Sequence, residues 1–210
     1  MRRGDRESAG FTQASTAIAQ AEFGNAASAR QQATAALALA PGTDVQTWAA
    51  LALACAGDAA PVDKLTESIN ERHPLDTIVQ SYWLPTIRAV VELNRNNPTR
   101  SLEFLRMVAP YEFSRQGALF PIYVRGQAYL MAHQSREAVA EFKKLVDHPG
   151  VVLNDPTGAL ARVGMARAYA MQGDTQKARA AYEDFFALWR DADPDIPILK
   201  KAKVEYAKVH

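Results

Sequence analysis

The sequence lacks several features that would point directly to a function. It has one cysteine, Cys55, which excludes an intrachain disulfide and a cysteine cluster that could bind zinc. Lys and Arg total 24 and Asp and Glu total 23, so the chain has no basic excess of the kind that nucleic-acid and membrane-surface binders need. No apolar run approaches the ~20 residues of a membrane-spanning helix. We therefore expect no nucleic-acid partner for this chain and no membrane span within it.

Catalytic and metal-binding motifs are also missing. The sequence has no P-loop, no His-Glu-x-x-His motif and none of the Gly-rich loop, His-Arg-Asp or Asp-Phe-Gly motifs of protein kinases. Asp191, Asp193 and Asp195 alternate as at the start of a calcium-binding loop. Ile196 and Ala202, however, occupy the positions where such a loop needs Gly and Glu. We expect no catalytic residue, no cofactor and no metal site, and we predict that the chain is not an enzyme.

The residues that are abundant favour helices. Alanine, which has the highest helix propensity, accounts for 39 residues, 20 of them in the first 60 positions. Strand signals are almost absent. The β-branched pair Val151-Val152 lies between Gly150 and Asn154-Asp155-Pro156, and we predict a loop there. The predicted fold class is all-α.

Turn markers recur along the chain at a nearly constant spacing. Gly24-Asn25, Gly57-Asp58 and Gly173-Asp174 each separate two helical patterns, and Asn96 and His133 occupy the corresponding places in the segments between them. The Gly would end one helix in the left-handed conformation, and Asn or Asp would cap the next helix. The five markers are 33, 39, 37 and 40 residues apart, a period typical of helical repeat arrays.

Prolines close each predicted helix pair, because proline cannot continue a helix. They are Pro41, Pro74, Pro110, Pro149 and Pro194. The markers together predict an array over 9–194, with a flexible tail over 1–8 and a capping helix over 195–210. The five helix pairs of the array span 9–41, 43–74, 76–110, 117–149 and 157–194.

Pairs four and five carry small and aromatic residues at matching offsets. Pair four has Gly126, Tyr129, Ala138 and Phe142, and pair five has Ala166, Tyr169, Ala178 and Tyr182. These offsets resemble the tetratricopeptide (TPR) signature, in which small residues let two helices approach and aromatic residues fill the space between them. The resemblance implies a right-handed α-solenoid whose first helices line a concave surface.

Three stretches give a narrower resemblance. Residues 81–85, 164–174 and 188–197 resemble the C-terminal TPR region of bacterial serine/threonine protein kinases, and related arrays follow winged-helix transcription regulators. The resemblance runs from about Ala21 to the C-terminus. It implies a sensor or docking region of a signalling protein, whose kinase or DNA-binding domain would belong to a longer parent.

Large side chains at positions that would face the concave surface form the candidate partner-binding site. They are Trp48, Leu51, Trp83, Ile87, Phe120, Tyr123, Gln127 and Arg167. Trp and Tyr are favoured binding anchors, since they bury much area and keep a polar group. We centre the site on Trp48, Trp83, Tyr123 and Gln127. Arg125 and Arg167 would orient an acidic or carbonyl-rich ligand. The alternative is that the aromatic residues pack neighbouring units together and have no solvent face.

The leading hypothesis is a non-enzymatic TPR module that binds a protein or peptide. Two alternatives stay open: a ligand-sensing regulatory region of a serine/threonine kinase or transcription regulator, and an oligomerisation scaffold formed by self-association. We see no signal peptide and expect a cytoplasmic location. A periplasmic location would apply if a membrane span precedes this segment in a longer parent.

Overall fold

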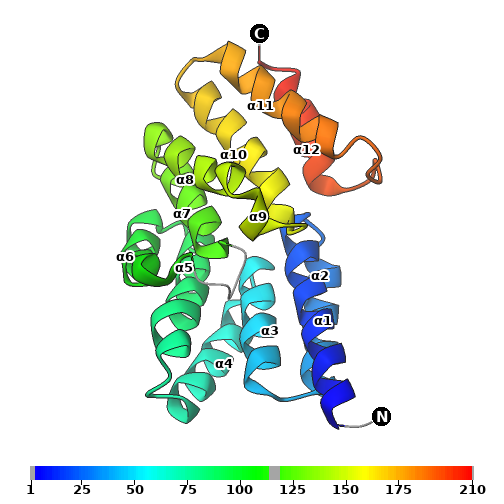
Figure 1. Cartoon of the computed structure of the whole chain (residues 1–210), viewed down its shortest axis with the longest axis vertical. Coiled ribbons are helices and arrows are strands. Elements are labelled where there is room, and N and C mark those ends of the chain that lie inside the picture. Colours follow the sequence, from blue (N-terminus) through cyan, green and yellow to red (C-terminus); the bar gives the residue numbers. More distant parts are fainter. Residues whose placement is uncertain (1–2, 114–118, 210) are drawn as a thin grey trace.

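The fold is entirely α-helical in the residues that the structure describes. The computed structural model describes residues 3–113 and 119–209, and these contain twelve α-helices and no strand (Figure 1). The helices are α1 (Arg3–Glu22), α2 (Ala26–Leu39), α3 (Thr43–Cys55), α4 (Ala59–Arg72), α5 (Leu84–Asn94), α6 (Pro98–Val108), α7 (Phe120–Met131), α8 (Ser135–Asp147), α9 (Pro149–Val152), α10 (Pro156–Met171), α11 (Thr175–Leu188) and α12 (Pro197–Tyr206). A π-helical turn, Val79–Trp83, precedes α5, and a 3₁₀ turn, Ala109–Tyr111, follows α6. The prediction of an all-α chain is confirmed.

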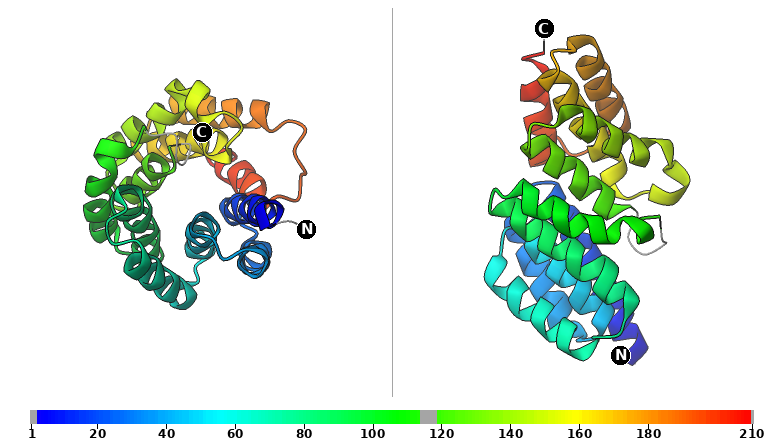
Figure 2. Two further views of the ribbon diagram at one scale, coloured as in Figure 1. Left: turned by 60° about the horizontal axis from the view of Figure 1, so that its bottom comes forward. Right: turned by 90° about the vertical axis from the view of Figure 1, so that its left-hand side faces the viewer.

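Helices that follow one another in the sequence pack side by side. α1 packs against α2 and α3, α3 against α4 and α5, and α5 against α6. α7 packs against α8, and α10 packs against both α8 and α11. The helices wind around a central axis, so that one view of the molecule shows a ring (Figure 2). Nearly all buried apolar residues belong to one continuous core that extends from α1 to the end of the chain.

The turn markers have the backbone conformation that the sequence predicts. Gly24, Gly57 and Gly173 have φ values of +91°, +84° and +75°, and Asn96 and His133, which replace glycine in this place, have φ values of +59° and +57°. A left-handed residue therefore ends the first helix at all five markers. The predicted side-chain caps are present at Asp174 and Asn97, and absent at Asn25 and Asp58.

Several element boundaries differ from the predictions. Residues 3–8, expected in a flexible tail, are helical. The negative charge of Asp5, in the first turn of α1, interacts favourably with the positive end of the helix dipole and stabilises this start. Val151 and Val152, expected in a loop, belong to the short helix α9, which Pro149 starts. α12 ends four residues before the predicted end at 210, and its N-cap is Ile196. The predicted start of pair four, residue 117, lies outside the described residues.

A proline accounts for the π-helical turn in the third predicted pair. Pro85 has no N–H, so the carbonyl of Ser81, four residues earlier, has no ordinary helical donor. The helix widens into π geometry just before Pro85 and continues as α5. Tyr82 and Trp83, on this turn, are both buried.

The ring of Phe142 sets how closely three helices approach. A Cβ atom placed on Gly126 of α7 would lie 2.6 Å from this ring, and one placed on Gly164 of α10 would lie 2.5 Å from it. Only glycine fits at either position with the ring where it is. Gly126 lets α7 approach α8 closely, as the sequence predicts for this position. Gly164 lets α10 approach α8 in the same way.

We predict that Gly164→Ala destabilises the fold by about 1–3 kcal/mol, because the methyl group must displace the Phe142 ring from a close-packed core. Gly4→Ala is the matched control. A Cβ at Gly4, in α1, meets nothing within 4 Å, so alanine there should be neutral or stabilising. Urea denaturation measures both variants, and equal stabilities would contradict the packing assigned to Phe142.

The two ends of the array touch, which closes the ring. The backbone N–H of Ile198 in α12 donates a hydrogen bond of 3.1 Å to the carbonyl oxygen of Phe23, in the turn after α1. The rings of Phe23 and Trp189 meet edge to face at 5.1 Å between centroids, and Gly24 lies directly against Pro197. Figure 2 shows α12 beside the α1–α2 end of the molecule. The last helix therefore covers the last pair, as predicted, and also contacts the first.

Deleting residues 196–210 should lower the melting temperature by roughly 5–10 °C. The deletion exposes the surface that Leu199 and Ala202 cover, and each kcal/mol is worth about 2–4 °C in a chain of this size. Differential scanning calorimetry tests this prediction. An unchanged melting temperature would show that α12 contributes nothing to closure.

Candidate functional site

Most of the predicted concave residues are buried in the core. Leu51 and Ile87 have 1% and 0% of their surface exposed, and Trp83, Phe120 and Tyr123 have between 5% and 6%. An open aromatic groove centred on Trp83 and Tyr123 is therefore wrong for this structure, since these side chains pack the helices together. The predicted residues that keep a partly exposed side chain are Trp48, Gln127 and Arg167.

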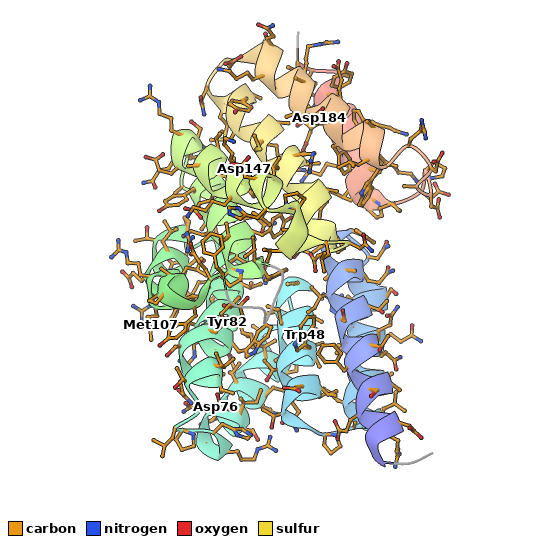
Figure 3. The ribbon with its side chains drawn as sticks, in the orientation of Figure 1. Trp48, Asp76, Tyr82, Met107, Asp147 and Asp184 are labelled. Atoms are coloured by element: carbon orange, nitrogen blue, oxygen red, sulfur yellow. The ribbon has the colours of Figure 1, made fainter. Side chains whose placement is uncertain are left out.

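The aromatic side chains of the first half contact one another in series, from α1 through α3 to the π-helical turn. Phe11 of α1 contacts Trp48 of α3 with ring centroids 4.8 Å apart, and Trp48 contacts Trp83 at 5.5 Å. Trp83 in turn meets Tyr82 at 4.9 Å. Trp48 and Tyr82 lie at similar heights in Figure 3. The structure thus brings Trp48 and Trp83 together as predicted, but as packing partners.

The two arginines expected to orient a ligand are already paired with acidic side chains. Arg125 is buried and donates hydrogen bonds of 2.6 Å to Glu112 and 2.7 Å to Glu141. Arg167 donates through Nε to Glu205 at 2.9 Å, which joins α10 to α12. Arg125 is therefore not available to a ligand. One terminal nitrogen of Arg167 is buried without a partner among the described residues.

A carboxyl group that the sequence analysis did not select lies where the end of α1 meets α3 and α7. Glu22 is the last residue of α1, and its half-buried carboxyl group lies among the polar groups of Tyr123 and Gln127 of α7 and Cys55 of α3. Burial raises the pKa of Glu22 to about 7. The described residues include no cationic partner for it within ion-pair distance. Three helices therefore hold one carboxyl group that has hydrogen-bond donors and lacks a countercharge.

A second carboxyl group lies close to Glu22. Asp155 precedes α10, and its carboxylate accepts hydrogen bonds from the backbone N–H of Thr157 at 2.9 Å and from the Thr157 hydroxyl at 2.6 Å. Its pKa is raised, mainly by burial, and the negative charge of Asp155 helps to raise the pKa of Glu22. The ends of α1 and α3 point toward α9 and this loop (Figure 1).

The two carboxyl groups line a small cavity, which we call the inner cavity. Its volume is about 260 Å³, and Trp48 and Phe120 form its aromatic walls. The remaining described lining residues include no Lys, Arg or His and, apart from Ile18, are small or polar: Ser15, Thr16, Ala19, Asn154, Pro156 and Thr157. Acidic oxygens beside aromatic faces favour a positively charged ligand.

Sequence reasoning missed this site because its residues come from distant segments. One local signal was present, since Glu22 ends a helix, where the negative end of the dipole disfavours a carboxylate. A carboxylate at this unfavourable position suggests that tertiary contacts or a function require Glu22. Asp155, in contrast, has the position of an ordinary helix N-cap and gives no such signal.

Comparisons with known proteins give no assignment. No protein-family model, no curated protein and no solved structure matches this chain. Within the described residues, no group of His, Cys, Asp and Glu side chains is arranged to hold a metal ion. A search of the same residues finds no helix with the length and hydropathy needed to cross a membrane.

The raised pKa of Glu22 predicts a pH dependence of stability. In the unfolded chain this carboxyl titrates near 4.5, and in the folded chain near 7. The unfolded state therefore loses its proton first, and the free energy of unfolding should fall by the order of 3 kcal/mol as pH rises through this window.

Glu22→Gln should remove this fall, because an amide does not titrate. Glu137→Gln, at an exposed position of α8, is the matched control and should keep the fall. Urea denaturation between pH 4.5 and pH 8 measures both. If Glu22→Gln keeps the full pH dependence, the proton belongs to another group.

Proposed function

We propose that this chain is a non-enzymatic binding module, built as a TPR-type α-solenoid of five helix pairs with a C-terminal capping helix. The pairing of α1 with α2, α3 with α4, α5 with α6, α7 with α8, and α10 with α11 supports this architecture. So do the left-handed turns between the helices of each pair and the Gly126–Phe142 contact. The exposed lysines of α12 and its buried Leu199 and Ala202 suit a cap.

Within this proposal, the ring closure favours a sensor of a small ligand over a receptor for an extended peptide. The contact of Ile198 with Phe23 joins the ends of the array, and the aromatic residues that would line an open groove are buried. The inner cavity, which residues of α1 and α3, the first residue of α7 and the start of α10 line, has room for a small ligand. A sensor region attached to a kinase or transcription regulator is the form of this function that the sequence resemblance favours.

The observation that carries the proposal is the unpaired Glu22 carboxyl group. Removing a carboxylate from water costs free energy, and the fold keeps this half-buried carboxyl group beside the polar groups of Tyr123, Gln127 and Cys55, with no cation paired to it among the described residues. An organic ammonium ion would supply the missing charge. It would donate hydrogen bonds to Glu22 and Asp155 and place its charge against the Trp48 ring. We therefore propose that the ligand is a small organic amine, protonated at neutral pH.

Putrescine, a compact diammonium ion, is a direct probe of this proposal. We expect saturable binding by isothermal titration calorimetry, with weak or no binding of 1,4-butanediol, its uncharged analogue. Binding should release protons near pH 7, because the cation favours the ionised form of Glu22, so the affinity should rise between pH 6 and pH 8.

Glu22→Gln should weaken putrescine binding at least tenfold, since a hydrogen bond to a charged group is worth about 1.5–3 kcal/mol. The exposed variant Glu137→Gln should bind as the wild type does. Equal affinities for putrescine and butanediol, or an unchanged affinity in Glu22→Gln, would refute the amine site.

A further inference from the structure

A second and larger cavity lies beside α9, and the proposed function does not use it. We call it the outer groove. Its volume is about 610 Å³, within the range of small-molecule sites. It forms where α8, α9, the start of α10 and the end of α11 meet the turn after α1. Its apolar walls include Phe23, Leu145, Val152, Leu153, Leu188 and Trp189.

The charges in the outer groove are few, and one of them is unpaired. Asp155 is occupied by Thr157, and Asp191, at the rim, is 3.7 Å from Arg190. Arg162 donates one hydrogen bond, of 2.7 Å, to the carbonyl oxygen of Gly158. Its guanidinium has five N–H donors, and no described carboxylate lies within ion-pair distance of it. The groove therefore presents one cation in mainly apolar surroundings.

The lip of the groove holds an apolar side chain in a strained conformation. Leu153 has φ +53° and ψ −125°, a region that residues with a side chain rarely adopt. Its side chain is 76% exposed, so no burial in the core offsets the free-energy cost of this conformation. Leu188, on the opposite helix, is also exposed. Both would be covered by an apolar ligand in the groove.

We propose that the outer groove binds an amphiphilic carboxylate, such as a fatty acid. The hydrocarbon chain would lie along the apolar walls, and the carboxylate would accept two parallel hydrogen bonds from Arg162, the geometry that guanidinium and carboxylate groups favour. The size of the exposed surface argues for a small ligand. A stable protein interface buries about 1,200–2,000 Å², whereas the large exposed apolar residues of the groove are Leu153 and Leu188.

Trp189 lines the groove and supplies the signal for a test. The probe is 12-bromododecanoate, used below its micelle concentration, because bromine quenches nearby tryptophan fluorescence. We expect saturable quenching in the intact chain, and loss of that quenching in Trp189→Phe, although Trp48 and Trp83 remain. Quenching that persists in Trp189→Phe would place the probe elsewhere and overturn the proposal.

Arg162→Gln tests the charge contact. It should weaken 12-bromododecanoate binding about 10–100-fold, to the affinity of 12-bromododecanol for the wild type, whereas Arg162→Lys should retain part of the binding. Arg136→Gln, at an exposed position of α8 outside the groove, is the control and should bind normally. Circular dichroism confirms that the variants fold.

Two results would overturn the proposal. Equal affinities of the wild type for 12-bromododecanoate and 12-bromododecanol would show that Arg162 does not bind the carboxylate. Sedimentation velocity that detects a dimer, which dissociates on Leu188→Ser, would assign the groove to a second copy of this chain. Binding of the acid at the groove is distinguishable from the amine site, because putrescine should not change the fluorescence of Trp189 through direct quenching.

Discussion

Close approach of helices at glycine and alanine is the constraint on which this structure depends. Phe142 fits only because Gly126 and Gly164 present no side chain to its ring. In the first half, Ala29, Ala33 and other buried alanines of α2 and α3 have the same effect, since a methyl group lets helix axes approach. Tight spacing gives the array enough curvature for α12 to reach the turn after α1. The same tight packing buries Trp83 and Tyr123 of the expected groove.

The inner cavity and the outer groove share one wall. Asn154, Asp155 and Pro156 line both, and the strained Leu153 precedes them directly. The negative charge of Asp155 acts on Glu22 across the inner cavity. Leu153 lines the outer groove. A segment of four residues therefore separates a proposed cation site from a proposed anion site, and each ligand would contact it from its own side.

Features fixed by short-range chemistry could be predicted from the sequence, and features fixed by long-range contacts could not. The turn at Gly173 follows from the conformational freedom of one residue, and its positive φ is confirmed. The inward and outward faces of α12 follow from helical period. In contrast, the partners of Arg125 lie 13 and 16 residues away, on other elements, and no spacing rule joins Arg125 to Glu112 and Glu141. The aromatic pattern at Trp83 was equally compatible with a binding surface and with a core.

Closure of the ring also changes how the array can evolve and unfold. In an open solenoid each unit contacts only its neighbours, so units can be added or lost and the ends can fray independently. Here the hydrogen bond from Ile198 to Phe23 makes the first and last units neighbours as well. A helix pair inserted between them would separate these two groups, so this contact limits the number of helices that the fold can hold. Fraying of one end removes contacts that the other end makes with it, at Phe23, Trp189 and Ile198. The two ends should therefore unfold together, as parts of a globular domain do.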